Sequence, residues 1–344
     1  MWATFSLISR IVVIFALNMI LDIARHKFYE GLLVLFLLAT IGVVSNFVMV
    51  NEAIANATIT SAPLQPALRD FTMAHPVIAA MLSLMLIMAT SLRLTRATIT
   101  HSLFQVGSLV TMSLSAVIIL GIGLHGNLLS NLIVAYIAAE AINRICYCIP
   151  PSPRLHHLFT AFMALGALPL FDSSMLAPAL LAPIVIILSR KKPREVVVAI
   201  IGLLVPAFIY SYVSWCQGAP FLSGISAIWR GMLTPSALAD GNYLSLPRLI
   251  MLGTAAFIQI CTSLIYHNDR LSISLISREI WKMLQILVLI FAACFAVLPS
   301  TTPASFLIIG LCISVMAPLL FNKIAGGGSM IAFFLLVGIA IWAM

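Results

Sequence analysis

Apolar runs long enough to cross a lipid bilayer follow one another along almost the whole chain. Each covers about 20 residues, the length that a helix needs to span a hydrocarbon core of about 30 Å. Within lipid, every backbone N–H and C=O must find a partner inside the protein, so such runs form helices. Only 8% of the 344 residues are charged, against about 25% in soluble domains. The sequence therefore predicts a single all-α transmembrane domain over residues 1–344, a polytopic bundle of about twelve helices.

The predicted spans are separated by short, more polar connections. The run at 2–23 is expected to be the first span, because it lacks the basic start and the cleavage pattern of a signal peptide. The short spans 155–171 and 174–189 could together form one broken element. Prolines inside predicted spans favour kinked or broken helices, which often lie beside ion paths; they are Pro178, Pro183, Pro206 and Pro318. The predicted spans are 2–23, 30–50, 75–92, 101–123, 127–149, 155–171, 174–189, 196–214, 246–266, 281–298, 303–321 and 326–343.

Basic residues collect on one side of these spans. With twelve spans, 14 of the 18 basic residues fall on one side, which the positive-inside rule assigns to the cytoplasm or the mitochondrial matrix. Both termini are then expected on the opposite side. The net charge of +8 is therefore a topology signal and not a nucleic-acid-binding patch. The basic side has Arg25, Lys27, Arg93, Arg96, Arg144, Arg154, Arg190, Lys191, Lys192, Arg194, Arg270, Arg278, Lys282 and Lys323, and the other side has Arg10, Arg69, Arg230 and Arg248.

Two longer connections, 51–74 and 215–245, lie on the less basic side. The first is rich in small and polar residues and contains two prolines. The second contains FLSGISAIWRGML at 221–233, which could form a short amphipathic helix along the membrane interface. Asp172 falls in the short turn between two predicted spans, where we expect it to be solvated.

Glu140 is the clearest ionisable residue inside a predicted span, and Arg144 follows it by four residues. Charges inside a bilayer are costly and mark functional candidates, and a pair at i and i+4 reduces the cost of both. One interpretation is a protonatable carboxylate in a proton path, tuned by the neighbouring cation. The other is a structural pair near the basic surface. Lys191, Lys192 and Lys282 lie near helix ends, where each is either a topology determinant or a relay partner.

Common motifs of catalysis and cofactor binding are absent from the sequence. It has no Gly-rich nucleotide loop, no H-E-x-x-H and no G-x-S-x-G pattern. The six cysteines lie mostly in apolar runs and are expected to be buried apolar residues. His156 and His157 have no carboxylate or cysteine at ligand spacing and are expected to be an interfacial pair. The sequence predicts no active site of its own and no directly bound cofactor, with lipids as the expected ligands.

A short polar turn, Gly126-Asn127-Leu128-Leu129, joins two apolar helices, and Glu140 follows in the second. This arrangement over 101–149 resembles the antiporter-like membrane subunits of respiratory complex I (NADH:ubiquinone oxidoreductase), most closely subunit 2. In that family the equivalent glutamate belongs to the proton path. A weaker likeness at 28–52 would place Glu52 near that position instead. The family has lysines in the middle of its helices, whereas the candidate lysines here lie near helix ends.

The resemblance implies a membrane-arm subunit that contributes to proton translocation coupled to electron transfer to ubiquinone. Glu140 would be the proton-path carboxylate, Arg144 its tuning cation, and Lys191, Lys192 or Lys282 a relay partner. The partners would be other membrane-arm subunits in the mitochondrial inner membrane, or in the plasma membrane of a prokaryote. Two alternatives stay open, a stand-alone secondary transporter and a structural membrane subunit of another respiratory complex.

Overall fold

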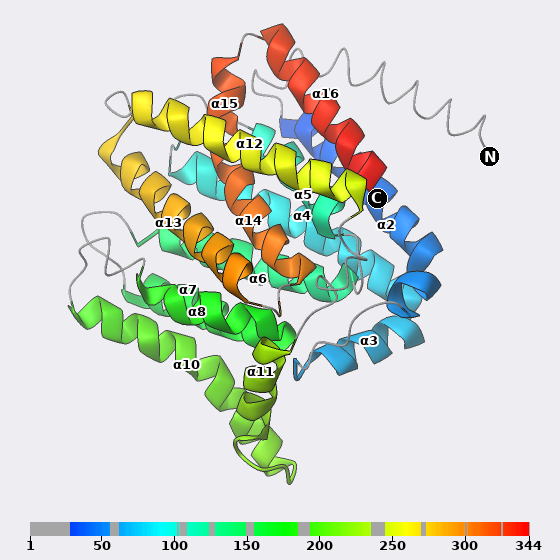
Figure 1. The fold of residues 1–344 in the computed structure, drawn as a ribbon, viewed down its shortest axis with the longest axis vertical. Coiled ribbons are helices and arrows are strands. Elements are labelled where there is room, and N and C mark those ends of the chain that lie inside the picture. Colours follow the sequence, from blue (N-terminus) through cyan, green and yellow to red (C-terminus); the bar gives the residue numbers. More distant parts are fainter. Residues whose placement is uncertain are drawn as a thin grey trace.

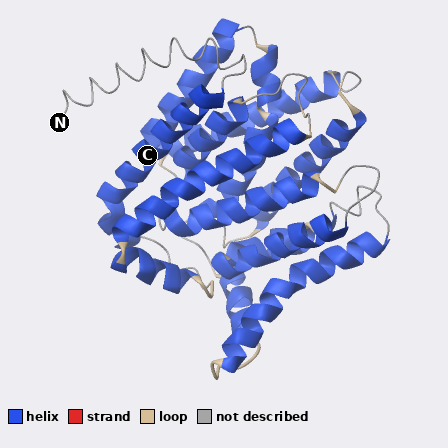
Figure 2. Cartoon of the chain, turned by 180° about the vertical axis from the view of Figure 1, so that it is seen from behind, coloured by secondary structure: helices blue, strands red, loops and turns tan. Residues whose placement is uncertain are grey.

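The computed structural model shows a bundle of helices, and all regular structure in the described residues is helical (Figure 1; Figure 2). The described residues are 28–55, 62–101, 103, 109–123, 128–148, 155–184, 193–234, 245–269, 273–298, 300, 302–324 and 326–343. The elements in chain order are α2 (Phe28–Ala55), α3 (Gln65–Ala74), α4 (Pro76–Thr100), α5 (Val110–Gly123), α6 (Leu128–Cys146), α7 (Leu155–Phe171), the 3₁₀-helix η1 (Ser173–Met175), α8 (Leu176–Leu181), α10 (Pro193–Cys216), α11 (Ser223–Leu233), α12 (Leu246–Asn268), α13 (Leu275–Val297), α14 (Pro303–Met316), α15 (Pro318–Lys323) and α16 (Gly326–Ala343).

The long apolar helices identify a membrane protein. In the described part of the chain, six are long and apolar enough to cross a bilayer: α4, α6, α10, α12, α13 and the consecutive pair α14–α15. Shorter apolar helices lie within α2, α5, α7 and α16. These helices fall on predicted spans and confirm the all-α transmembrane bundle. The predicted span 2–23 and residues 185–189 of span 174–189 lie outside the described residues.

The connection 51–74 contains helical structure for which no helix was predicted. Helix α2 continues to Ala55, and residues 65–74 form helix α3. A proline lies in the first turn of α3, where it is tolerated because the first N–H groups of a helix have no intrahelical partner. One proline of this connection therefore lies at a helix start. The segment 223–233 is helical, as its amphipathic pattern predicted.

Prolines in the apolar spans have different effects. Helix α14 ends at Met316 and α15 begins at Pro318, because proline removes a backbone N–H and fits the first turn of a new helix. By contrast, α10 continues through Pro206. The segment after α7 forms only η1 and the six-residue α8 before residue 182. It is thus a broken element, as the prolines in 174–189 favoured.

Helices α5 and α14 form the interior of the bundle. Nearly every residue of both is buried, and α2, α4, α6, α12, α13 and α16 pack around one or both of them. Helix α10 lies at the edge of the bundle and packs mainly against α7 (Figure 1). Its outer face exposes Ile201, Leu204 and Phe208, which suits contact with lipid.

Helices α7 and α10 approach each other at two glycines. A Cβ added at Gly166 would lie 2.1 Å from the backbone oxygen of Leu203. A Cβ added at Gly202 would lie 2.7 Å from the backbone oxygen of Phe159. Small residues at helix contacts let backbones come close, which supplies packing energy where lipid weakens the hydrophobic drive.

The two ends of the bundle differ in composition. One end, called here the basic end, is formed where α4, α6 and α15 end and where α7, α10 and α13 begin. There Lys323 Nζ forms an ion pair with Asp269 Oδ2 at 2.6 Å. The far end of α10 and the adjacent α11 expose Tyr212, Trp215 and Trp229. Exposed Tyr and Trp collect at membrane–water interfaces, so these residues mark the opposite interface.

Candidate functional site

Glu140 lies on α6 one helical turn before Arg144, and α4 brings Arg93 to the same carboxylate. Arg144 Nε donates a hydrogen bond to Glu140 Oε1 at 2.7 Å. Arg93 Nε lies 3.5 Å from Glu140 Oε2 and forms an ion pair with it without a well-aligned hydrogen bond. The Glu140 side chain is only 20% exposed. Two guanidinium groups therefore neutralise one largely buried carboxylate at the basic end.

His157, at the start of α7, extends this group. Arg144 Nη1 lies 3.3 Å from His157 Nδ1, and because arginine has only donors, Nδ1 must accept this hydrogen bond. The His157 ring stacks on Tyr147 with a centroid distance of 5.2 Å and contacts His156 at 4.0 Å. We call this set the basic-end cluster; it comprises Arg93, His101, Glu140, Arg144, Tyr147, His156 and His157.

His101 completes the cluster from the C-terminal cap of α4. Its ring contacts Tyr147 edge to face, with centroids 4.6 Å apart. Burial lowers the pKa of His101 below its ordinary value of 6.5, because a buried ring disfavours the charged form. Its Nε2 is buried without a hydrogen-bond partner in the described structure. The cluster thus gathers three histidine rings beside the Glu140–Arg144 pair.

The predicted lysines take no part in the described contacts of Glu140. Lys282 lies near the start of α13 with an exposed side chain. Lys191 and Lys192 lie outside the described residues. A relay role for these three side chains stays a prediction. The structure instead places Arg93 and His157 around the Glu140–Arg144 pair, and these two residues were not among the site residues expected from the sequence.

Asp172 forms a second polar group, and here the sequence expectation was wrong. Asp172 was expected to be solvated, but only 6% of it is exposed. Its Oδ1 accepts hydrogen bonds from the backbone N–H of Ser174 at 3.0 Å and from the Ser174 hydroxyl at 2.9 Å. Its Oδ2 accepts a hydrogen bond from the hydroxyl of Thr302. Burial follows because α11 packs over η1 and because the start of α14 reaches the turn.

The charge of Asp172 is compensated by dipoles and not by a cation. Within the described structure, no arginine, lysine or histidine forms an ion pair with it. Asp172 is the N-cap of η1, and its carboxylate accepts hydrogen bonds from one backbone N–H and two hydroxyl groups. Burial nevertheless raises its pKa above the ordinary value of 3.8, against the opposing effect of the hydrogen bonds from Thr302 and Ser174.

The sequence contains local signals for the two helix caps in this second group, but it does not show that the two caps lie close together. Asp172 two residues before Ser174 suits a helix cap, and Thr302 before Pro303 suits another. The two caps are 130 residues apart, and no local pattern joins them. The basic-end cluster and the Asp172 group lie at opposite ends of α7, a helix of 17 residues and therefore about 25 Å long.

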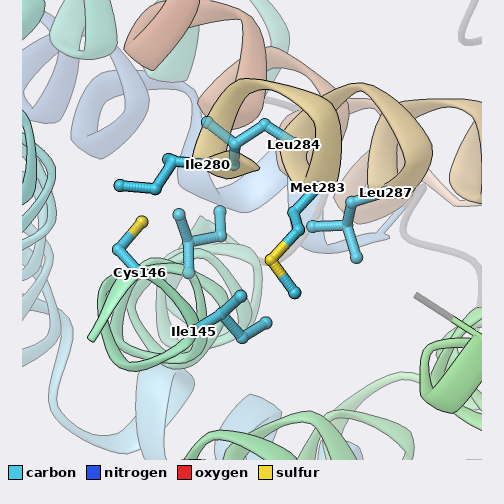
Figure 3. A pocket seen from close by; sticks show the side chains of 7 residues that line it. Ile145, Cys146, Ile280, Met283, Leu284 and Leu287 are labelled. Carbon is cyan, nitrogen blue, oxygen red and sulfur yellow. The ribbon is translucent and has the colours of Figure 1, made fainter. Parts of the chain in front are cut away.

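A small pocket lies between α6 and α13 (Figure 3). It has room for about one water molecule. On α6 the pocket lies roughly opposite Glu140, because its lining residues are two, five and six positions further along the helix. The pocket offers almost no polar surface and suits neither a charge nor a proton. Its lining residues are Ile142, Ile145, Cys146, Ile280, Met283, Leu284 and Leu287.

In the part of the chain that the structure describes, no three His, Cys, Asp or Glu side chains are grouped so as to hold a metal ion. The six cysteines are free, and Cys216 is exposed while Cys146, Cys148, Cys294 and Cys312 are buried. No protein-family model, no curated protein and no solved structure matches this chain.

Proposed function

We propose that this chain moves protons across a membrane and that Glu140 and Asp172 are its proton-exchanging side chains. The observation that carries the proposal is the buried carboxylate of Asp172, which has no cation partner in the described structure. Ionisable groups inside membrane bundles are expensive and mark ion or proton pathways. Glu140 lies at the other end of α7, so each side of the membrane has an acidic group near it.

The two carboxylates lie in different surroundings. Asp172 accepts hydrogen bonds from two hydroxyl groups and one backbone N–H, and burial favours its protonated form. Glu140 is held by the guanidinium groups of Arg93 and Arg144. A proton that enters at one end therefore meets an environment that differs from the one at the exit. Such a difference allows uptake and release to be controlled separately.

Buried polar atoms in the helices around Glu140 support a polar interior. Ser91 Oγ on α4, Thr111 Oγ1 on α5 and Asn143 Oδ1 on α6 are buried without a hydrogen-bond partner in the described structure. An unpaired buried polar atom costs about 1–3 kcal/mol. Groups of this kind gain a hydrogen bond when a water molecule or proton carrier passes.

The resemblance over 101–149 gives this function a place in a larger assembly. In that form of the proposal, the chain is a membrane-arm subunit of NADH:ubiquinone oxidoreductase. It packs against sister subunits of the mitochondrial inner membrane or, in a prokaryote, of the plasma membrane. The support is the turn at 126–129 followed by Glu140, together with the pairing of Glu140 to two arginines.

A stand-alone secondary transporter is the second candidate. It is favoured by the broken element η1–α8 beside Asp172 and by the break between α14 and α15, because transporters often bind ions at discontinuous helices. The two candidates differ in their partners. Native electrophoresis of the chain extracted in mild detergent separates them: a complex I subunit migrates with a large assembly containing other chains, whereas a transporter migrates as a monomer or small homo-oligomer.

Proton flux into liposomes tests the proposed function. The purified chain is reconstituted with a pH-sensitive dye inside the vesicles, and an imposed potential drives proton entry. We expect Glu140→Gln and Asp172→Asn to lower the flux towards that of protein-free liposomes. Glu279→Gln is the control, since Glu279 is exposed on α13, and it should keep wild-type flux. Wild-type flux in both test variants would refute the proposed roles, provided that all variants elute as folded protein.

A further inference from the structure

The contact between His157 and Arg144 fixes where the histidine holds its proton. All nitrogen-bound hydrogens of the Arg144 guanidinium are donors, so the 3.3 Å contact from Arg144 Nη1 requires an unprotonated Nδ1 on His157. His157 in this structure is therefore neutral, with its hydrogen on Nε2. This state follows from the geometry of two groups and does not depend on what the protein transports.

The guanidinium that contacts His157 also holds Glu140. Arg144 Nε donates to Glu140 Oε1 at 2.7 Å while Nη1 contacts His157 Nδ1. Because Nε and Nη1 belong to one planar group, a displacement at Nη1 is passed to Nε. A proton added to Nδ1 uses the lone pair that accepts from Arg144 and places two cations side by side. Arg144 must then move, and its hydrogen bond to Glu140 weakens.

We infer that His157 is a positioning residue for Glu140: neutral His157 keeps Arg144 on the carboxylate, and a proton on His157 Nδ1 releases Arg144 and prepares Glu140 to accept a proton. The consequence for transport rests on the proposed function, whereas the protonation state of His157 does not. In this arrangement, a proton arriving from the basic end is sensed before it reaches Glu140.

Other charged and titratable groups near His157 define its surroundings. Glu140 and Arg144 lie on α6, Tyr147 follows the end of α6, and His156 precedes His157 on α7. Helix α4 contributes Arg93, which forms an ion pair with Glu140. Helix α10, which packs against α7, begins at the same end with Arg194 and the buried Glu195. Through Arg144, His157 contacts a group that also binds Glu140.

Nitrogen-15 NMR of the histidine-labelled chain in lipid bilayers tests the protonation state. We expect the histidine signal that His157→Gln lacks to show hydrogen on Nε2 and an unprotonated Nδ1 at pH 8. His267→Gln is the matched control and should retain the signal, because His267 is exposed near the end of α12 and lies outside the basic-end cluster. A signal from His157 with hydrogen on Nδ1 at pH 8 would overturn the inference.

The pH profile of proton flux tests the positioning role. Wild-type flux should rise on acidification through about pH 7 to 6, where histidines titrate, and His267→Gln should show the same rise. His157→Gln should give a flat profile over this range. If His157→Gln keeps the wild-type profile while the wild type conducts, the positioning role is wrong. If the wild type conducts no protons at any pH, the proposed function fails, and the NMR result still decides the state of His157.

Discussion

The glycine contact between α7 and α10 gives a stability prediction whose size follows from the structure. A Cβ at Gly166 would lie 2.1 Å from the backbone oxygen of Leu203, 2.8 Å from its carbonyl carbon and 3.0 Å from its Cα. All three atoms belong to the backbone, so no side-chain rotation relieves the overlap. The helices must separate by about 1 Å to restore van der Waals contact. Overpacking of this kind costs about 1–3 kcal/mol.

Alanine has a higher helix propensity than glycine, and this gain in stability offsets only part of the cost of overpacking. Replacing glycine by alanine within a helix stabilises it by about 1 kcal/mol where space is open. Gly253 on α12 is such a site, because nothing lies within 4 Å of an added Cβ. We therefore expect Gly166→Ala to lower the melting temperature, Gly202→Ala to lower it less, and Gly253→Ala to raise it slightly. The shift should be at most about 2–4 °C per kcal/mol for a chain of this size.

Thermal unfolding in detergent measures the melting temperatures of the three variants and so tests their expected order. A thiol-reactive dye reports unfolding, because Cys146 and Cys312 are buried in the folded bundle. Signal from Cys216, which is exposed, is removed by substituting it with serine in all variants. An equal or higher melting temperature for Gly166→Ala than for Gly253→Ala would show that α7 and α10 do not pack at the distance seen here.

Two further predictions concern Asp172 and the topology. Because burial raises the pKa of Asp172 above 3.8, the unfolded chain loses this proton first as pH rises. The free energy of unfolding should then fall from about pH 4 up to the folded-state pKa and level off above it. Melting temperatures in nanodiscs should show this decline in the wild type, and Asp172→Asn should lack it; identical slopes would contradict the burial of this carboxylate. Cys216, at the far end of α10, should react with a membrane-impermeant maleimide only from the face opposite Lys323, and labelling from the Lys323 face would place α10 the wrong way across the membrane.

Local patterns were sufficient for the apolar helices and for part of the candidate site. The apolar runs predicted the spans because span length is set by bilayer thickness alone. The Glu140–Arg144 pair was predictable because residues four apart share a helix face. Helix α3 was not predicted, because it lies in the polar connection 51–74, outside the apolar runs.

Tertiary structure decided which polar groups meet. Arg93 reaches Glu140 because α4 packs along α6, and His157 reaches Arg144 because α7 does so too. Asp172 is buried because α11 packs over η1 and because the start of α14, 130 residues away, reaches its turn. Hydropathy reports how each segment partitions between water and lipid. The partner of a charge depends on how helices pack against each other, and within lipid that packing rests on side-chain shape and close contacts, which no single segment encodes.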